Sequence, residues 1–340
     1  MAAFRRVRYG CRVLRSRIVG VGAALPETVV GNDAVEARLG VESGWIEGRT
    51  GVRERRILAD GDSLVDLAAA AARAALDQAS VAPKDVDAIV VATTSGPYLF
   101  PSLACLLHER LGIGTSPAFD VAAACAGFPY AVTVADQGIR AGDHQRVLVV
   151  GADRLSALCE PTDRMTSPLF GDGAGAVVLV ADEQSGEGGS GILVARLRAL
   201  GDLWPILYVR SGARRPEDLP PGGEDPWMRM KGQDVFRAAV EQLVALTREV
   251  LDLAGLRPED VQLLVPHQAN VRIIRMMISQ LKISPDRVGI NLDRCGNTSA
   301  ASIPIALEEA HRAGKLKTGD VLVVNAVGGG MTAGALVARW

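Results

Sequence analysis

Apolar runs typical of buried strands alternate with segments of helical spacing along the first half of the chain. The strand-like runs are IVGVGAAL, VDAIVVATT, AFDVA, RVLVVGAD and AGAVVLVA. Between them, the spacing of apolar residues predicts helices at 63–79, 103–111 and 126–141. Apolar strands that alternate with helices indicate an α/β architecture with a largely buried sheet.

This regular pattern stops between about residues 183 and 226. Gly, Pro, Ser and charged residues dominate EQSGEGGSG and RSGARRPEDLPPGGEDP, and the strand-like ILVARLRAL lies between them. We expect a domain boundary near residue 183 and a surface loop at 210–226. The chain is thereby divided into a basic extension (1–17), an N-terminal half (18–183) and a C-terminal half (184–340).

The second half repeats the plan of the first. VDAIVV corresponds to VQLLVP, and RVLVVGAD corresponds to DVLVVNAV. Cys125 precedes the glycine of an Arg-Ala-Gly by 17 residues, and Asn297 precedes the glycine of a second Arg-Ala-Gly by the same 17. We therefore expect Cys125 and Asn297 at equivalent helix starts that face each other. The alternative is chance similarity between two alanine-rich α/β segments.

Composition excludes several classes of protein. The 37 Lys and Arg residues nearly balance the 39 Asp and Glu residues, so no overall field favours nucleic acid or a membrane surface. No apolar run approaches the roughly 20 residues that span a bilayer. The five cysteines form no CxxC pair, which argues against a disulfide framework or a zinc site and favours a reducing compartment such as the cytoplasm.

The first 17 residues carry six arginines and no acidic residue. This composition is similar to that of an organelle transit segment. We prefer the simpler interpretation, in which these 17 residues are an irregular segment ahead of a domain that begins at Ile18.

Cys125 stands among alanines and glycines in AFDVAAACAGFPYAV, between a predicted strand and a predicted helix. Small neighbours leave room for a long, thin substrate. The free N–H groups and the positive dipole end of the following helix would favour thiolate over thiol. We therefore interpret Cys125 as a nucleophile.

His267 in VPHQAN and Asn297 in GNTSAAS occupy similar places at the ends of apolar runs, where open α/β sheets carry their sites. Two N–H donors beside a thiolate would stabilise an enolate made from a thioester. A histidine in this place is more often a hydrogen-bonded core residue, but its combination with Cys125 and Asn297 favours a functional role. The order Cys, His, Asn also occurs in papain-like proteases, whose local cysteine signature is absent here.

Three glycine-rich segments need separate interpretation. GVGAALPE and GDGAG lack the features of a phosphate loop or a dinucleotide site, so we predict tight turns. The GGG at 328–330 follows the last long apolar run. It predicts a hairpin between the last two strands, and it would also let a backbone N–H approach an acyl group on Cys125.

The chain resembles the β-ketoacyl-acyl-carrier-protein synthase III enzymes of the thiolase superfamily from about Ile18 to Trp340. The resemblance is carried by WIEGRTGVRERR, ATTSGPYLFPSLAC, AFDVAAACAGF, EPTDRMT, LFGDGAGAVVL, LVPHQANVRI and GNTSAASIPIAL. It implies a five-layered α-β-α-β-α fold of two similar halves and a homodimer. It also implies decarboxylative condensation of an acyl-CoA primer with malonyl-acyl carrier protein, without a metal or a resident cofactor.

The resemblance implies roles for four residues at the reacting centre. Cys125 matches the acylated nucleophile. His267 and Asn297 match the pair that promotes malonyl decarboxylation and stabilises the enolate. Gly329 matches the second oxyanion N–H, beside that of Cys125. His267 must be neutral for this role, which its ordinary pKa of about 6.5 permits.

The same resemblance implies binding residues. The CoA adenine would lie between Trp45 and Arg164, with Arg49 near the phosphates. Phe100 matches a residue that closes the primer pocket of the partner subunit. Four basic residues would form a docking patch for the acidic carrier protein, although an ordinary solvated face is the alternative: Arg237, Arg272, Arg275 and Lys282.

Two departures from the family pattern affect the primer pocket. Val327 stands where well-known members carry a phenylalanine, and Met331, Thr332 and Ala333 replace an aromatic pair. A roomier site keeps open an alternative function in polyketide or other specialised metabolism, including acyl transfer without loss of CO2. A non-catalytic partner subunit is a third hypothesis, which the presence of Cys125 disfavours.

Overall fold

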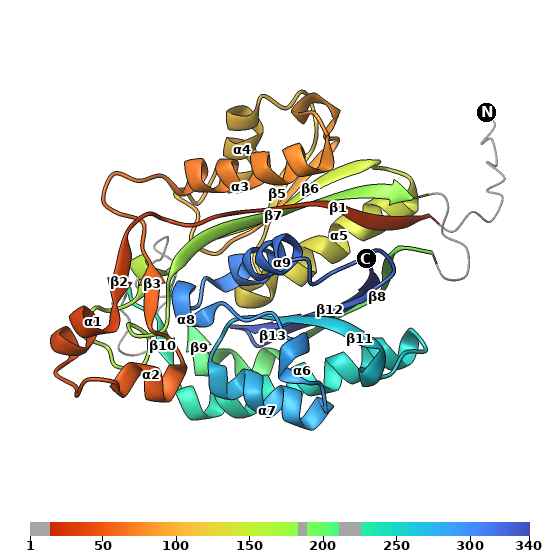
Figure 1. Cartoon of the computed structure of the whole chain (residues 1–340). Coiled ribbons are helices and arrows are strands. Elements are labelled where there is room, and N and C mark those ends of the chain that lie inside the picture. Colours follow the sequence, from red (N-terminus) through yellow and green to blue (C-terminus); the bar gives the residue numbers. More distant parts are fainter. Residues whose placement is uncertain (1–13, 183–188, 211–225) are drawn as a thin grey trace, which may run out of the picture.

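The computed structural model describes residues 14–182, 189–210 and 226–340, and two sheets dominate it (Figure 1). The strands are β1 (Arg15–Ala24), β2 (Val29–Gly31), β3 (Glu54–Arg56), β4 (Ala88–Ala92), β5 (Ala118–Val121), β6 (Arg146–Arg154), β7 (Asp172–Asp182), β8 (Gly191–Ala199), β9 (Leu207–Tyr208), β10 (Arg229–Met230), β11 (Val261–Pro266), β12 (Val321–Gly328) and β13 (Thr332–Arg339). The α-helices are α1 (Asn32–Leu39), α2 (Trp45–Thr50), α3 (Leu64–Ala79), α4 (Leu103–Leu111), α5 (Gly127–Ala141), α6 (Gly232–Leu253), α7 (Val271–Leu281), α8 (Leu292–Cys295) and α9 (Ser302–Arg312). Among the described residues, no helix has the length and apolar character needed to span a membrane.

The two sheets share one strand order, which confirms the duplication expected from the sequence. The first sheet runs β1-β7-β6-β4-β5, and the second runs β8-β13-β12-β11. In each sheet, the first three strands are antiparallel neighbours and the next pair is parallel. Val288 forms a parallel bridge to Leu264 of β11, in the place that β5 takes in the first half. The repeated segments noted in the sequence are β4 with β11 and β6 with β12.

Five layers result, with helices on both outer faces and between the sheets. Figure 1 shows α3 and α4 above the first sheet, α5 and α9 between the sheets, and α6 and α7 below the second. Successive side chains of β4 point to opposite faces of the sheet, so this one strand contributes to the apolar cores on both sides of it. Val90 faces the core around α5 and α9, whereas Ile89 and Val91 face the core beneath α3 and α4.

The predicted helices of the first half are confirmed, and their ends follow ordinary capping chemistry. Ser63 caps α3 by accepting a hydrogen bond from the Asp66 N–H at 3.2 Å. Ser102 caps α4 in the same way from the Cys105 N–H at 3.1 Å. Gly142 ends α5 in the left-handed conformation, with a φ of 83°.

The prediction of tight turns at the first two glycine-rich segments is wrong. Gly20 and Gly22 lie inside β1, where an added Cβ would overlap the carbonyl oxygens of Ala75 and Ala71 in α3. Gly175 lies inside β7, where an added Cβ would come within 2.8 Å of the Pro304 side chain. These glycines let helices approach the sheet closely, which the composition of the segment alone does not reveal. The hairpin expected at 328–330 is confirmed, because it joins β12 to β13.

Some predicted boundaries fall outside the described residues. They include residues 1–13 of the basic extension, the boundary at 183 and most of the predicted loop at 210–226. The first sheet already begins at Arg15, so the last part of the predicted extension belongs to β1 rather than preceding the domain. Two small two-stranded sheets, β2 with β3 and β9 with β10, complete the fold near one end of the large sheets.

Candidate active site

One cavity of about 790 Å³ brings together the three residues predicted to react. Cys125, His267 and Asn297 all line it. They come from the start of α5, the end of β11 and the loop before α9. The remaining lining residues with predicted roles are Trp45, Arg49, Arg164, Arg237, Arg272 and Val327. The cavity therefore joins parts of both halves.

Cys125 lies in a 3₁₀ turn, Ala124–Ala126, that leads directly into α5. Cys125 is 7 % exposed and lines the cavity. Burial raises the pKa of the thiol to about 12, and the nearby Asp153 raises it further, against a lowering contact with Ser299. The prediction that the helix start favours thiolate is therefore wrong. Burial disfavours the charged form of a thiol, and it is the largest cause of the shift.

His267 follows directly after β11. Its side chain is buried and lies close to the start of α9, the helix that carries Ser302. Its Nδ1 lies 2.7 Å from Ser302 Oγ, and its backbone N–H donates to the Asn325 carbonyl at 2.8 Å. Burial lowers the pKa of His267 to about 3, opposed by a hydrogen bond with the Ser299 backbone. The ring is neutral at pH 7, as the predicted role requires. Because Ser302 engages Nδ1, a ligand in the cavity meets this ring through Nε2.

Asn297 is held rigidly by its neighbours, which determines how its amide can act. Its Oδ1 accepts the Ser299 N–H at 2.9 Å, and its backbone N–H donates to the Leu169 carbonyl at 2.8 Å. With Oδ1 engaged by a backbone donor, the Nδ2 amino group is the part left for a ligand. The side chain therefore supplies hydrogen-bond donors to the cavity that it lines.

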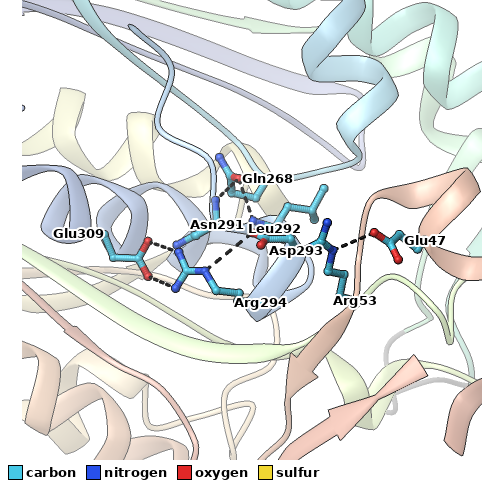
Figure 2. Close-up of polar contacts among 8 residues, drawn as sticks. All are labelled: Glu47, Arg53, Gln268, Asn291, Leu292, Asp293, Arg294 and Glu309. Carbon is cyan, nitrogen blue, oxygen red and sulfur yellow. Dashed lines mark hydrogen bonds and ion pairs between the residues drawn. The ribbon is translucent and has the colours of Figure 1, made fainter. Parts of the chain in front are cut away.

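Gln268, beside His267, is fully buried and organises the segment before Asn297. Its Oε1 accepts the N–H groups of Asn291 at 3.1 Å and Leu292 at 3.2 Å, as Figure 2 shows. Its Nε2 donates to the carbonyls of Pro266 at 2.7 Å and Gly289 at 3.1 Å. The side chain thus ties the start of α8 to the end of β11. We did not single out Gln268 from the sequence, although its place directly after His267 was the available signal.

Ion pairs extend this network from α8 to α9 and to α2 (Figure 2). Arg294 lies 3.0 Å from Glu309 of α9, and Arg53 lies 2.8 Å from Glu47 of α2. The Arg53 N–H also donates to the Asp293 carbonyl at 2.9 Å. The Arg53–Glu47 pair is exposed, so its contribution to stability is small. Its geometric effect is to connect α2, which carries Trp45, to α8.

The mouth of the cavity carries the aromatic and basic residues expected to bind CoA. The guanidinium of Arg49 lies 4.4 Å from the centroid of the Trp45 ring. Arg164 instead donates to the carbonyls of Leu39 at 3.0 Å and Gly40 at 3.3 Å. In this structure Arg49, rather than Arg164, stacks on the indole. The three side chains line one cavity, and the expected Trp45–Arg164 stack is not among the ring contacts of the described residues.

The two predicted primer-pocket residues lie in different surroundings. Val327 is buried and lines the cavity. Phe100 is 82 % exposed and does not line it. Tyr98 and Leu99, next to it in the chain, are exposed as well. Of the basic docking residues, Arg237 and Arg272 line the cavity, while Arg275 and Lys282 are exposed on or just after α7.

The GGG hairpin packs directly against the nucleophile. A Cβ added to Gly328 would lie 2.6 Å from the Cys125 nitrogen, so this position has no room for a side chain. Gly329, the residue predicted to donate the second oxyanion N–H, follows immediately and lies beside Leu207.

The two helix starts face each other, but Cys125 and Asn297 are not equivalent positions. Ala124 and Ser299 each adopt a left-handed φ, of 46° and 53°, as the first residue of a 3₁₀ turn. This feature aligns Cys125 with Ala300 rather than with Asn297. Measured from these aligned residues, the Arg-Ala-Gly glycine lies 17 positions on in the first half, at Gly142, and 14 positions on in the second, at Gly314, so the equal spacing from Asn297 is a coincidence. Asn297 reaches the cavity from the loop that precedes its turn.

A duplicated five-layered fold with Cys, His and Asn on one cavity defines a condensing enzyme of the thiolase type. Residues 119–201 match the family model for 3-oxoacyl-[acyl-carrier-protein] synthase III, and residues 251–340 match the model for its C-terminal part. The chain is 44 % identical over 325 residues to "Beta-ketoacyl-[acyl-carrier-protein] synthase III 1" of Vibrio vulnificus, covering 96 % of this chain and 99 % of that protein. The chain belongs to the β-ketoacyl-[acyl-carrier-protein] synthase III family.

Solved structures agree with this assignment. The crystal structure of 3-oxoacyl-[acyl-carrier-protein] synthase III from Aquifex aeolicus superposes with a TM-score of 0.88 at 42 % identity, covering 96 % of this chain and all of that chain. The priming β-ketosynthase of the R1128 polyketide biosynthetic pathway superposes with a TM-score of 0.89 at 33 % identity, covering 96 % of each chain. The thiolase fold is therefore shared with enzymes named for both fatty-acid and polyketide synthesis.

Proposed function

We propose that this protein condenses an acyl-CoA primer with malonyl-acyl carrier protein to start fatty-acid synthesis. The observation that carries the proposal is the meeting of Cys125, His267 and Asn297 on one cavity with a mouth that suits CoA. The curated relative above is 44 % identical, whereas the polyketide priming enzyme is 33 % identical. This difference favours fatty-acid synthesis over the specialised alternative.

In the first half-reaction, the Cys125 sulfur attacks the thioester carbonyl of the acyl-CoA and CoA leaves. The carbonyl oxygen becomes negatively charged in the transition state. Backbone N–H groups of Cys125 and Gly329 would stabilise that charge. The tight contact of Gly328 with the Cys125 turn supports this arrangement, because it holds the hairpin against the nucleophile.

In the second half-reaction, malonyl-carrier protein loses CO2 and its enolate attacks the acyl group on Cys125. His267 Nε2 and Asn297 Nδ2 would donate hydrogen bonds to the enolate oxygen. Neutral His267 supports this role, because a charged imidazolium is not required and burial disfavours it. The thioester already activates the acyl group, so the proposed steps need no bound metal or cofactor.

The mouth of the cavity supports binding of CoA. Trp45 offers a flat face for the adenine, and Arg49 already stacks on that face. Arg164 would complete the sandwich only after it leaves the Leu39 and Gly40 carbonyls. We propose that the nucleotide displaces Arg49 toward its phosphates and recruits Arg164.

The carrier protein would dock beside the same mouth. Arg237 and Arg272 line the cavity, and Arg275 and Lys282 lie exposed on or after α7. An acidic carrier protein suits this arrangement.

We also propose that two copies pair through the face that carries Phe100, so that Phe100 closes the partner's primer pocket. Cytoplasmic localisation is supported by the free state of the four cysteines that the structure describes.

One experiment tests the proposed function. The protein is incubated with a panel of acyl-CoAs, its intact mass is measured, and malonyl-carrier protein is added while CO2 and β-ketoacyl product are followed. We expect one acyl adduct that Cys125→Ala abolishes and that Cys105→Ala, at an exposed cysteine outside the cavity, preserves. A stable adduct without CO2 or product would replace condensation by simple acyl transfer, and no adduct would exclude both.

A further inference from the structure

Thr332 is the first residue of β13, paired with Gly328 across the GGG hairpin, and the proposed reaction does not yet use its side chain. Its hydroxyl oxygen lies 2.8 Å from the Ala123 carbonyl oxygen and 3.2 Å from the Gly329 carbonyl oxygen. Both neighbours are acceptors, so the hydroxyl donates its single proton, and the shorter contact is to Ala123. Ala123 and Thr332 are 209 positions apart in the chain. The hydroxyl therefore joins the two halves of the molecule next to the nucleophile.

The Ala123 carbonyl is the group that closes the turn around Cys125. It accepts the Ala126 N–H at 3.1 Å, which completes the 3₁₀ turn that contains Cys125. Ala124 in this turn has a left-handed φ of 46°, which is rare for alanine and persists only where surrounding groups impose it. The Thr332 hydroxyl supplies one such constraint from outside the turn.

Hydrogen bonds anchor the GGG hairpin both at β8 and at the turn. At β8, Met331 exchanges two backbone hydrogen bonds, of 3.1 Å and 2.8 Å, with Leu200. At the turn, the Thr332–Ala123 contact is the one hydrogen bond that joins it to the hairpin within residues 14–182, 189–210 and 226–340. Close packing of the hairpin against the nucleophile adds to it. The hydroxyl is thus the directional link between these two segments.

We propose that Thr332 is a positioning residue that holds the two N–H groups of the oxyanion hole at a fixed separation. The inference rests on the proposed function, in which the N–H groups of Cys125 and Gly329 stabilise the negative oxygen of the reacting thioester. Such an oxygen is stabilised by donors that stand about 2.7–3.1 Å from it, so a small displacement of either donor weakens the effect. The bond from Thr332 to Ala123 connects the segments that carry these donors. Thr332 does not line the cavity, so it acts through them.

The place of this bond predicts which reactions of Cys125 depend on it. Attack on a thioester passes through a negatively charged carbonyl oxygen, which needs the oxyanion hole. Alkylation by iodoacetamide displaces iodide from a saturated carbon and forms no such oxygen. Loss of the Thr332 hydroxyl should therefore slow acylation and spare alkylation of the same sulfur.

The first test compares Thr332→Val with Thr332→Ser. Valine keeps the shape of threonine without the hydroxyl, and the Ala123 carbonyl still accepts the Ala126 N–H, so the variant leaves no orphaned carbonyl. Acylation by saturating acyl-CoA is followed by intact mass in a single turnover, which gives a rate constant and the fraction of protein that reacts. We expect the rate constant of Thr332→Val to fall roughly 10-fold, less than the ~10²–10³-fold cost of losing a donor outright. Thr332→Ser should stay within about threefold of wild type, and half-saturation by acyl-CoA should be unchanged in both.

Two readouts separate positioning from general loss of structure. Partial unfolding lowers the fraction of protein that acylates, whereas a displaced oxyanion hole lowers the rate constant. Alkylation of Cys125 in Thr332→Val should stay within about threefold of wild type. Thr133→Val is the matched control, because it removes a hydroxyl that donates to another backbone carbonyl, that of Pro129 in α5, at 2.6 Å. Thr133 does not line the cavity, so this variant should acylate like wild type.

Amide hydrogen exchange tests the link itself without any substrate. If the hydroxyl holds hairpin and turn together, its loss should increase local opening of both segments. In Thr332→Val we expect peptides that span 121–127 and 328–333 to exchange roughly fivefold faster than in wild type. Thr133→Val should leave both segments unchanged.

The outcomes separate this inference from the proposed function. If wild-type protein forms no acyl adduct, the proposed function fails; faster exchange in Thr332→Val then still supports the link, and unchanged exchange overturns it. A wild-type rate constant of acylation in Thr332→Val would overturn the inference as well. So would an equal loss of acylation and alkylation, because the defect would then lie in the thiol rather than in the oxyanion hole. A loss in Thr133→Val equal to that in Thr332→Val would reduce the effect to general loosening of the core.

Discussion

At the scale of single residues, burial controls protonation in the cavity. It raises the pKa of Cys125 to about 12 and lowers the pKa of His267 to about 3, so both groups are uncharged at pH 7. The same desolvation acts in opposite directions because the thiol becomes charged by losing a proton and the imidazole by gaining one. A neutral histidine suits the proposed contact with an enolate, and the proposed attack of Cys125 on a thioester requires the thiol to lose its proton.

The low pKa of His267 predicts a loss of stability in acid. The unfolded chain binds a proton near its ordinary pKa of 6.5, while the folded chain stays neutral until about pH 3. Stability is therefore fully present above pH 6.5 and falls by about 1.4 kcal/mol for each pH unit below it. Urea denaturation at pH 7.5 and pH 5.0 should show about 2 kcal/mol more loss in the wild type than in His267→Gln. Equal losses in the two proteins would show that His267 titrates normally.

Residue type and local context were enough to select Cys125, His267 and Asn297 as candidates for one shared site. Reactive or polar side chains at the ends of apolar runs are unusual, and the strand order places those ends together. Gln268 was missed because glutamine is common in such places. Its importance depends on which groups it meets across the fold, and its side chain accepts the N–H groups of Asn291 and Leu292, 23 and 24 positions further along the chain.

At the scale of elements, the close approach of helix and strand explains the glycines of β1. Gly20 and Gly22 face α3, whose buried residues are mostly alanine. The carbonyl groups of the helix lie where side chains of the strand would otherwise project. The glycines of β1 therefore indicate a close approach of this strand to α3 rather than a turn.

Gly20→Ala tests this interpretation. Its new Cβ would overlap the Ala75 carbonyl oxygen, so the helix must move, and we expect a loss of about 1–3 kcal/mol in the free energy of unfolding. Gly31→Ala is the control, since nothing lies within 4 Å of its added Cβ and its φ of −73° suits any residue. Denaturation midpoints measure both. If Gly20→Ala were as stable as Gly31→Ala, the packing argument would fail.

At the scale of the whole molecule, an exposed apolar face stands apart from the cavity. Tyr98, Leu99 and Phe100 are each more than 60 % exposed, and Phe119 of β5 at the edge of the first sheet is 39 % exposed. Large exposed apolar groups at a sheet edge are typical of an interface. A second copy of the chain is the occupant that the proposed homodimer requires.

Phe100→Asp tests the pairing of two copies. A charge in this face would have to be buried without a partner, so we expect the sedimentation velocity of the protein to change from dimer to monomer. Acylation should weaken together with dimerisation if Phe100 closes the partner's primer pocket. Leu253→Asp, at an exposed leucine ending α6, should leave both unchanged. A Phe100→Asp protein that stayed dimeric would exclude this face.

Hydrophobic periodicity in the chain was sufficient to predict the α/β class, the duplication and three helices of the first half, because these depend on interactions between near neighbours. Motifs were sufficient to indicate the family and to select three residues, Cys125, His267 and Asn297, that the structure brings to one cavity. The equivalence of Cys125 and Asn297 was wrong, since the length of α9 is set by packing and not by spacing from a glycine. The protonation of Cys125 and His267 and the meeting of residues from both halves on one cavity depend on burial and on distances between remote segments, which arise only when the two halves fold together.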